Sequence, residues 1–259
     1  MKLASYADGS RDGHLVVVSR DLTQAHYASG ICTRLQDLLD DWGFIAPQLQ
    51  DLAVQLNHGK LRHAFPFEPG KCLAPLPRAY GWAVVAADGR VRREAGQFLG
   101  GGKPLRALAS CEPALMAIAG DLHAASDAGA ALDALRLLGL AVDWRAEGEL
   151  VASHAAPLAV TPDELGDAWQ RGVLQASLVA LHNGSKLEPR DVAAAPGEAL
   201  ARVVRWRALR AGQLAGVALG ALDIALAPGD SLRLDLKAAD GQHSLFGAID
   251  LDFLPPPAA

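Results

Sequence analysis

Short runs of apolar and β-branched residues, most of them closed by a turn that contains glycine or aspartate, dominate this chain of 259 residues. Such runs are typical of strands, whereas an amphipathic helix needs apolar residues three and four positions apart. Helical patterns interrupt the strand patterns at a few places and do not alternate with them. Strict alternation would favour a parallel α/β sheet, so the observed order predicts an α+β protein with a β-rich core.

The start of the chain has a clear order of strand and helix patterns. Residues 3–20 contain two apolar runs separated by the turn Asp8–Gly13, which predicts a β-hairpin. Residues 33–42 and 46–57 then carry apolar residues at helical spacing, which predicts two amphipathic helices. The order indicates a small β/α module.

Prolines at short intervals follow this module. The stretch 65–77 contains four prolines and should run extended as a linker. We therefore expect a small N-terminal domain over residues 1–75 and a second domain over residues 76–259.

The second domain contains further helix and strand patterns. A helix is predicted over 127–138, with Asp127 as its N-cap. Another is predicted after Thr161, where Pro162 and Glu164 complete the signature of a capping box. The other apolar runs predict strands over 82–86, 114–119, 174–181, 222–226 and 231–236.

The charge pattern argues against polyanionic partners. The formal net charge is -5, and the densest basic stretch, Arg90–Arg93, is followed at once by Glu94. So few charges do not make the basic stripe that binds nucleic acid or an acidic membrane. We expect neither nucleic acid nor a membrane as a partner.

The cysteines and the first residues favour a cytoplasmic protein. The N-terminus has no apolar signal-peptide core, and no apolar run approaches the length of a membrane span. Cys32, Cys72 and Cys111 are odd in number and far apart, which suits buried side chains in a reducing compartment. No cysteine or histidine spacing supports a zinc site.

Longer motifs point to a family. They are Lys2–Tyr6, Gly13–Leu22, Ala25–Tyr27, Leu56–Lys60, Ala74–Tyr80, Ala159–Trp169, Leu209–Gly212 and Pro228–Arg233. Together these motifs resemble the fumarylacetoacetate hydrolase family, specifically its bacterial branch with a small N-terminal domain. The resemblance is close over the first third and the last stretch of the chain and patchy in the middle.

The resemblance implies a mixed β-roll, shortened here in the middle, with a Mg²⁺ or Ca²⁺ site made of Asp and Glu oxygens. Members of the family cleave a carbon–carbon bond in a β-diketo acid, or decarboxylate or isomerise related 2-oxo acids. The metal acts as a Lewis acid, and a His polarised by a Glu activates water. Relatives are commonly homodimers, so we expect a homodimer here.

The family pattern of site residues is incomplete in this chain. By the resemblance, Glu112 fits the first metal ligand of a Glu-x-Glu strand and Asp143 fits a further ligand, but Ala114 stands at the second Glu position. The segment after Tyr80 lacks the water-activating His, and an expected Lys is absent further on. The loop 215–220 has no hydroxyl left for substrate.

Two interpretations of Glu112 and Asp143 stay open. Two carboxylates can hold Mg²⁺ if water and substrate supply the other ligands. Alternatively, both are remnants that are solvated or hydrogen-bonded, which the alanine at 114 favours. No catalytic residue is assigned, because Ser153 and His154 lack a third orienting group. The loop Gly100–Pro104 has Pro where a phosphate loop needs Ser or Thr, so a turn is expected.

Two functions compete. The first is a catalytically impaired or inactive family member, which needs no metal and pairs with itself or with an active paralogue. The second is a working fumarylacetoacetase-like hydrolase of tyrosine or aromatic catabolism, which acts on a small oxo acid with its metal on Glu112, Asp143 and one further carboxylate. We favour the first, because a metal ligand and the general base are both missing.

Overall fold

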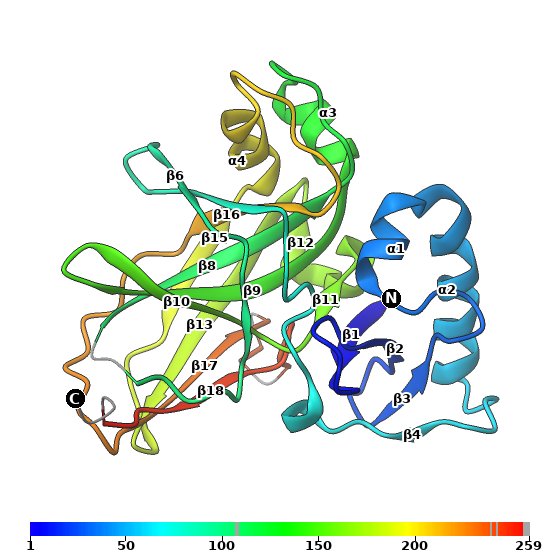
Figure 1. The fold of residues 1–259 in the computed structure, drawn as a ribbon, viewed down its shortest axis with the longest axis horizontal. Coiled ribbons are helices and arrows are strands. Elements are labelled where there is room, and N and C mark those ends of the chain that lie inside the picture. Colours follow the sequence, from blue (N-terminus) through cyan, green and yellow to red (C-terminus); the bar gives the residue numbers. More distant parts are fainter. Residues whose placement is uncertain (107–108, 239, 242, 256–259) are drawn as a thin grey trace.

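The computed structural model describes residues 1–106, 109–238, 240–241 and 243–255. The N-terminal elements lie together on one side of the molecule, and the long strands lie on the other (Figure 1). The N-terminal elements are β1 (Lys2–Tyr6), β2 (His14–Val18), β3 (Gln24–Tyr27), α1 (Leu35–Asp40), α2 (Trp42–Asn57), β4 (Phe65–Pro66) and the short 3₁₀ helix η1 (Pro69–Lys71).

A large mixed sheet runs through both parts of the molecule. Its strand order is β4-β3-β2-β1-β11-β9-β8-β16-β5-β6, with β10 paired to β9 and β7 paired to β10. Its later strands are β5 (Gly81–Val85), β6 (Val91–Glu94), β7 (Leu99–Gly100), β8 (Ser110–Ala119), β9 (Leu135–Ala146), β10 (Glu149–Ala155), β11 (Ala159–Val160) and β16 (Gln213–Ala218). Because β1 pairs with β11, the N-terminal strands continue the sheet of the second part.

A smaller antiparallel sheet has the order β12-β13-β17-β18, and β14 and β15 also pair with β13. Its strands are β12 (Trp169–Gln170), β13 (Val173–His182), β14 (Ser185–Lys186), β15 (Arg190–Ala194), β17 (Ser231–Lys237) and β18 (Ile249–Asp252). Further helices are α3 (Ala128–Asp133) between β8 and β9, the 3₁₀ helix η2 (Pro162–Ala168) between β11 and β12, and α4 (Pro196–Val203) between β15 and β16. No helix in the described ranges is long and apolar enough to cross a lipid bilayer.

The large sheet is buried on both faces. Successive side chains of a strand point to opposite faces, so Leu115 of β8 packs with Leu178 of the smaller sheet. The next residue, Met116, packs instead with Leu38 and Leu49 of the N-terminal helices. The central strands therefore need apolar residues on both sides, and the molecule has the β-rich α+β architecture expected from the sequence.

Several predicted elements are confirmed. The hairpin around Asp8–Gly13 forms, with β1 and β2 antiparallel. The two N-terminal helices form as well, and α2 begins at Trp42, four residues before the predicted start. Gly101 and Gly102 lie in a turn, as expected for the glycine-rich loop.

The helix predicted over 127–138 is wrong in its second half. Asp127 caps α3 as predicted, accepting a hydrogen bond from the Ala130 amide at 2.8 Å, but the helix ends at Asp133. Residues 135–146 form β9 instead. The leucines of this segment fit a helical stripe, but they also fit a strand that is buried on both faces, and the sheet provides both faces.

The segment after Thr161 and the predicted strand 222–226 also differ. Pro162–Ala168 is a 3₁₀ helix, and the Thr161 hydroxyl does not cap it but donates to the Met1 carbonyl at 3.3 Å. Glu164 accepts a hydrogen bond from Arg20 at 2.9 Å instead of closing a capping box. Within 222–226 only Leu222 forms a bridge, to Cys111, so the strand predicted over 222–226 is wrong.

Candidate functional site

Glu112 and Asp143, the two expected metal-ligand positions, lie side by side in the large sheet. Glu112 on β8 is the register partner of Asp143 on the antiparallel strand β9. Paired residues project to the same face of a sheet with their β-carbons about 5 Å apart. Ala114 lies one step further along β8, opposite Ala141, so the second expected Glu position faces apolar core.

Asp143 is held inside the protein by neutral donors. Asp143 is 2% exposed. The indole Nε1 of Trp82 donates to both carboxylate oxygens, at 3.1 and 2.9 Å, and the Ser153 hydroxyl donates to Oδ1 at 2.6 Å. Burial raises the pKa of Asp143 above its ordinary value, although the hydrogen bonds from Ser153 and Trp82 oppose the shift.

A glycine makes room for the Trp82 indole. A β-carbon on Gly216 of β16 would lie 2.4 Å from the ring atom Cη2 of Trp82. Any side chain at 216 would therefore push the indole out of its present position. Gly216 on β16 therefore allows Trp82 on β5 to reach Asp143 and donate to it.

Glu112 is neutralised by arginines rather than by neutral donors. Arg92 of β6 donates to Glu112 Oε2 at 2.6 Å. Arg145, two residues beyond Asp143 on the same face of β9, places its Nε 3.3 Å from the same oxygen. Arg145 also forms an ion pair with Glu94 and donates to the Gly148 carbonyl at 3.1 Å.

These partners do not fit a divalent metal ion. A hard dication needs several oxygen ligands that face one point. Here the oxygens of Asp143 accept three hydrogen bonds in the core, and the guanidinium groups of Arg92 and Arg145 lie against Glu112. Among the described residues, no group of three or more His, Cys, Asp or Glu side chains could hold a metal ion.

Ser153 and His154 do not form a catalytic pair. Because they are adjacent on β10, their side chains point to opposite faces. Ser153 contacts Asp143, whereas the His154 ring lies 3.0 Å from the Lys103 carbonyl through Nε2 and packs edge-on against Trp144. Burial lowers the pKa of His154 to about 4, so the imidazole is neutral.

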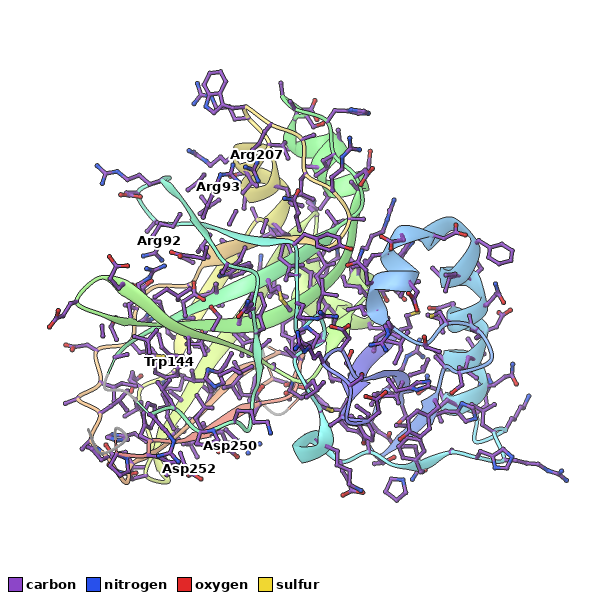
Figure 2. All side chains as sticks on the ribbon, viewed as in Figure 1. Arg92, Arg93, Trp144, Arg207, Asp250 and Asp252 are labelled. Carbon is purple, nitrogen blue, oxygen red and sulfur yellow. The ribbon has the colours of Figure 1, made fainter. Side chains whose placement is uncertain are left out.

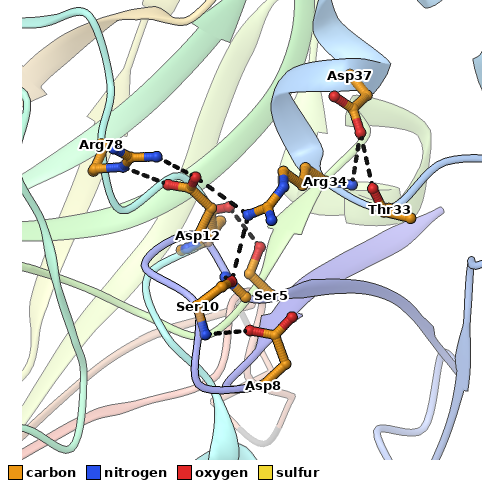
Figure 3. Close-up of polar contacts among 10 residues, drawn as sticks. Ser5, Asp8, Ser10, Asp12, Thr33, Arg34, Asp37 and Arg78 are labelled. Carbon is orange, nitrogen blue, oxygen red and sulfur yellow. Dashed lines mark hydrogen bonds and ion pairs between the residues drawn. The ribbon is translucent and has the colours of Figure 1, made fainter.

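A second polar cluster joins the N-terminal module to the segment before β5. Asp12 in the hairpin turn accepts hydrogen bonds from Nε and Nη2 of Arg78 and from Arg34 at 3.2 Å (Figure 3). Asp37 in turn accepts from the Arg34 amide at 3.1 Å. The cluster borders a cavity of about 500 Å³, but its two arginines are matched by two aspartates.

Sequence reasoning missed the groups that surround the two carboxylates. Trp82, Arg92, Arg145 and Ser153 come from four different strands, and pairing of these strands alone brings them together. One signal was available for Arg92, because alternate residues of the segment 91–94 must face the same side if it forms a strand. No local pattern indicates the contact between Trp82 and Asp143, which spans 61 residues.

A known family model matches the N-terminal part of the chain. The family model described as "Fumarylacetoacetase N-terminal domain 2" matches residues 1–78. A search of curated proteins finds no significant match.

Solved structures share the fold along the whole chain. A maleylpyruvate hydrolase from Sphingobium sp. SYK-6 matches with a TM-score of 0.74 at 15% identity, over 98% of this chain and 100% of that chain. The same hydrolase in complex with manganese(II) and pyruvate matches with a TM-score of 0.74 at 15% identity, over 99% and 100%. A fumarylacetoacetate hydrolase from Exiguobacterium antarcticum matches with a TM-score of 0.69 at 14% identity, over 98% and 99%. At these identities the likeness shows the fold alone.

Residues 1–78 are similar to the fumarylacetoacetase N-terminal domain, and the whole chain is similar in fold to a fumarylacetoacetate hydrolase.

Proposed function

We propose that this protein is a family member in which metal-dependent hydrolysis is impaired or lost. The observation that carries the proposal is the set of partners around Asp143 and Glu112. Trp82 and Ser153 donate to Asp143, and Arg92 and Arg145 compensate the charge of Glu112. A dication at this position would have to displace hydrogen-bond donors and approach two positive charges, which is electrostatically unfavourable.

The absence of a positioned general base supports the same proposal. The segment from Tyr80 into β5 contains no histidine, and the imidazole of His154 faces the side of the sheet opposite to Ser153 and Asp143. Loss of a positioned general base alone costs about 10²–10⁴-fold in rate. A fold can persist when its site is lost, because the residues that pack the core are not those that carry the chemistry.

The alternative is a working hydrolase of a small oxo acid with Mg²⁺ or Ca²⁺ bound. Glu94 is the carboxylate that could join Glu112 and Asp143, since Arg145 contacts both glutamates. A structural neighbour was solved with manganese(II) and pyruvate, which makes a divalent metal and an oxo acid the ligands to test. This alternative requires Arg92 and Arg145 to withdraw from the carboxylates.

We further propose that the protein is a cytoplasmic homodimer, or a partner of an active paralogue. The support is the resemblance to the fumarylacetoacetate hydrolase family, whose members commonly pair through the β-roll. Light scattering coupled to size-exclusion chromatography measures the mass in solution. A monomer that also fails to pair with a family hydrolase would contradict this proposal.

Isothermal titration calorimetry with Mg²⁺, Ca²⁺ and Mn²⁺ tests the loss of the metal site. We expect no binding heat and no turnover of fumarylacetoacetate or maleylpyruvate, while an active family hydrolase gives both in the same assay. Metal binding that disappears in Glu112→Ala and persists in Asp235→Asn, a buried carboxylate of the smaller sheet, would overturn the proposal. Asp235 is a matched control because it is 5% exposed and accepts from Ser244 at 2.7 Å.

A further inference from the structure

Two arginines meet where β6 approaches the end of α4. Arg92 and Glu94 of β6 face the Glu112 cluster, so strand alternation turns Arg93 to the opposite face. There Arg93 donates to the Val203 carbonyl, in the last turn of α4, at 2.8 Å. Arg207 follows α4 by four residues, and Figure 2 shows it beside Arg93 next to that helix.

The two guanidinium groups have no carboxylate of their own. In the described ranges of the chain, no Asp or Glu lies within ion-pair distance of Arg93 or Arg207, and Arg207 makes no hydrogen bond. Burial and the charge of Arg207 lower the pKa of the Arg93 guanidinium. Two like charges in this arrangement repel each other unless an anion lies between them.

The arginines border a cavity of about 200 Å³ at the sheet edge. Gln213 lines it too, and its Oε1 accepts from the Arg210 amide while its Nε2 is left to donate. Glu94 is the acidic residue of the lining, and its carboxylate is engaged by Arg145. The polar lining therefore offers donors and positive charge.

The rest of the lining is apolar. Ala83, Val203 and Leu209 form walls of the cavity, and each is buried. An inorganic oxyanion would leave these walls unused, whereas a short organic acid would cover them and bring a carboxylate to the arginines. Arginine is well suited to this group because its fork of N–H donors matches the two carboxylate oxygens.

We propose that the cavity between β5, β6 and residues 207–214 is a binding site for a small carboxylic acid. The carboxylate lies between Arg93 and Arg207 and accepts from both guanidinium groups, and the short apolar chain contacts Ala83 and Leu209. The site lies on the α4 side of β6, away from the Glu112–Asp143 pair, and it does not depend on whether a metal binds there.

The test is a titration of the full chain with sodium butyrate, with butyramide as the neutral isostere and inorganic phosphate as the second anion. Binding is followed by the NMR signals of the Gln213 side-chain amide, which lines the cavity, assigned from their loss in Gln213→Glu. We expect saturable shifts with butyrate at roughly 1 mM, none with butyramide, and weaker binding of phosphate. Phosphate binding as tight as that of butyrate would overturn the assignment to an organic acid.

Two variants complete the test. Arg207→Gln, which removes no internal hydrogen bond and should fold normally, is expected to weaken butyrate binding about tenfold or more. Arg205→Gln is the matched control, because Arg205 stacks on the exposed Trp206 ring at 4.9 Å and does not line the cavity. No butyrate binding to the wild-type chain, or equal loss in both variants, would overturn the proposal.

Discussion

Asp143 has a different environment from a metal ligand, although its residue type and its strand position fit one. It is buried, it accepts hydrogen bonds from Trp82 and Ser153, and its pKa is raised chiefly by burial. An Asp at this position of the chain was expected from the family resemblance. Its partners were not, because Trp82 lies 61 residues away in the sequence.

The raised pKa of Asp143 predicts that the effect of Asp143→Asn on stability depends on pH. The folded chain keeps this proton at pH values where the unfolded chain, with a pKa of about 3.9, has released it. Ionisation of Asp143 therefore lowers the free energy of unfolding as the pH rises through the folded pKa. Asp143→Asn cannot ionise, so its stability relative to wild type should increase from about pH 4 towards pH 7, measured by urea unfolding.

Asp12→Asn is the control with the opposite sign. The hydrogen bond from Arg78 lowers the pKa of Asp12, so this carboxylate stabilises the folded chain above its ordinary pKa and ceases to do so at lower pH. This variant should lose stability relative to wild type as the pH rises. A pH-independent difference for Asp143→Asn would contradict the raised pKa.

At the scale of the element, strand alternation decides which side chains meet. On β6 it sends Arg92 to Glu112 and Arg93 to Val203 of α4, although the two arginines are adjacent in sequence. The adjacent arginines 92 and 93 thus contact two separate regions, on opposite faces of the sheet. The fate of each arginine could be predicted only once the segment was known to be a strand.

The strand pair β5–β16 gives a prediction on packing. Gly216→Ala places a β-carbon against the Trp82 ring and should lower the free energy of unfolding by about 1–3 kcal/mol. The smaller ring of Trp82→Phe relieves the clash, so adding Gly216→Ala to that variant should have a reduced effect in a double-mutant cycle. Urea unfolding of the four chains measures both.

Gly43→Ala in α2 is the matched control for the glycine substitution. A β-carbon at Gly43 meets nothing within 4 Å, and alanine has the higher helix propensity. This variant should be as stable as wild type or slightly more so. Additive effects of Gly216→Ala and Trp82→Phe would contradict the proposed clash.

At the scale of the whole molecule, the N-terminal module and the second part share a sheet and a core. Strand β1 pairs with β11, and Leu49 of α2 belongs to the same apolar cluster as Met116 and Ile118 of β8. The module is thus recognisable as a sequence unit and matches a family domain over residues 1–78. Its apolar helix faces nevertheless need the large sheet for burial.

The shared core predicts cooperative unfolding. Leu49→Ala, at a fully buried position, should lower the free energy of unfolding by about 2–5 kcal/mol. In a Trp42→Phe background the fluorescence comes only from tryptophans after residue 80, and its midpoint should shift together with the far-UV circular dichroism. Val54→Ala, at a residue 43% exposed on the same helix, should change little. A shift seen only by circular dichroism would mean that the module unfolds independently.

The sequence by itself determined the elements whose signals are local. Turn residues at Asp8–Gly13 and apolar spacing over 33–57 were sufficient for the first hairpin and the N-terminal helices, because the interactions that define them span a few residues. The β-rich class was likewise predictable from the order of the apolar runs, and the family resemblance pointed to Glu112 and Asp143.

Only the tertiary structure decided the rest. Residues 135–146 became a strand because two apolar layers cover both of its faces, a condition that no local pattern records. Pairing of distant strands set Trp82 on Asp143 and Arg145 on Glu112, and packing of β6 on α4 set Arg93 beside Arg207. Charge and hydrogen bonding at a site depend on distances in space, so the sequence supplied the two carboxylates and the fold supplied their chemistry.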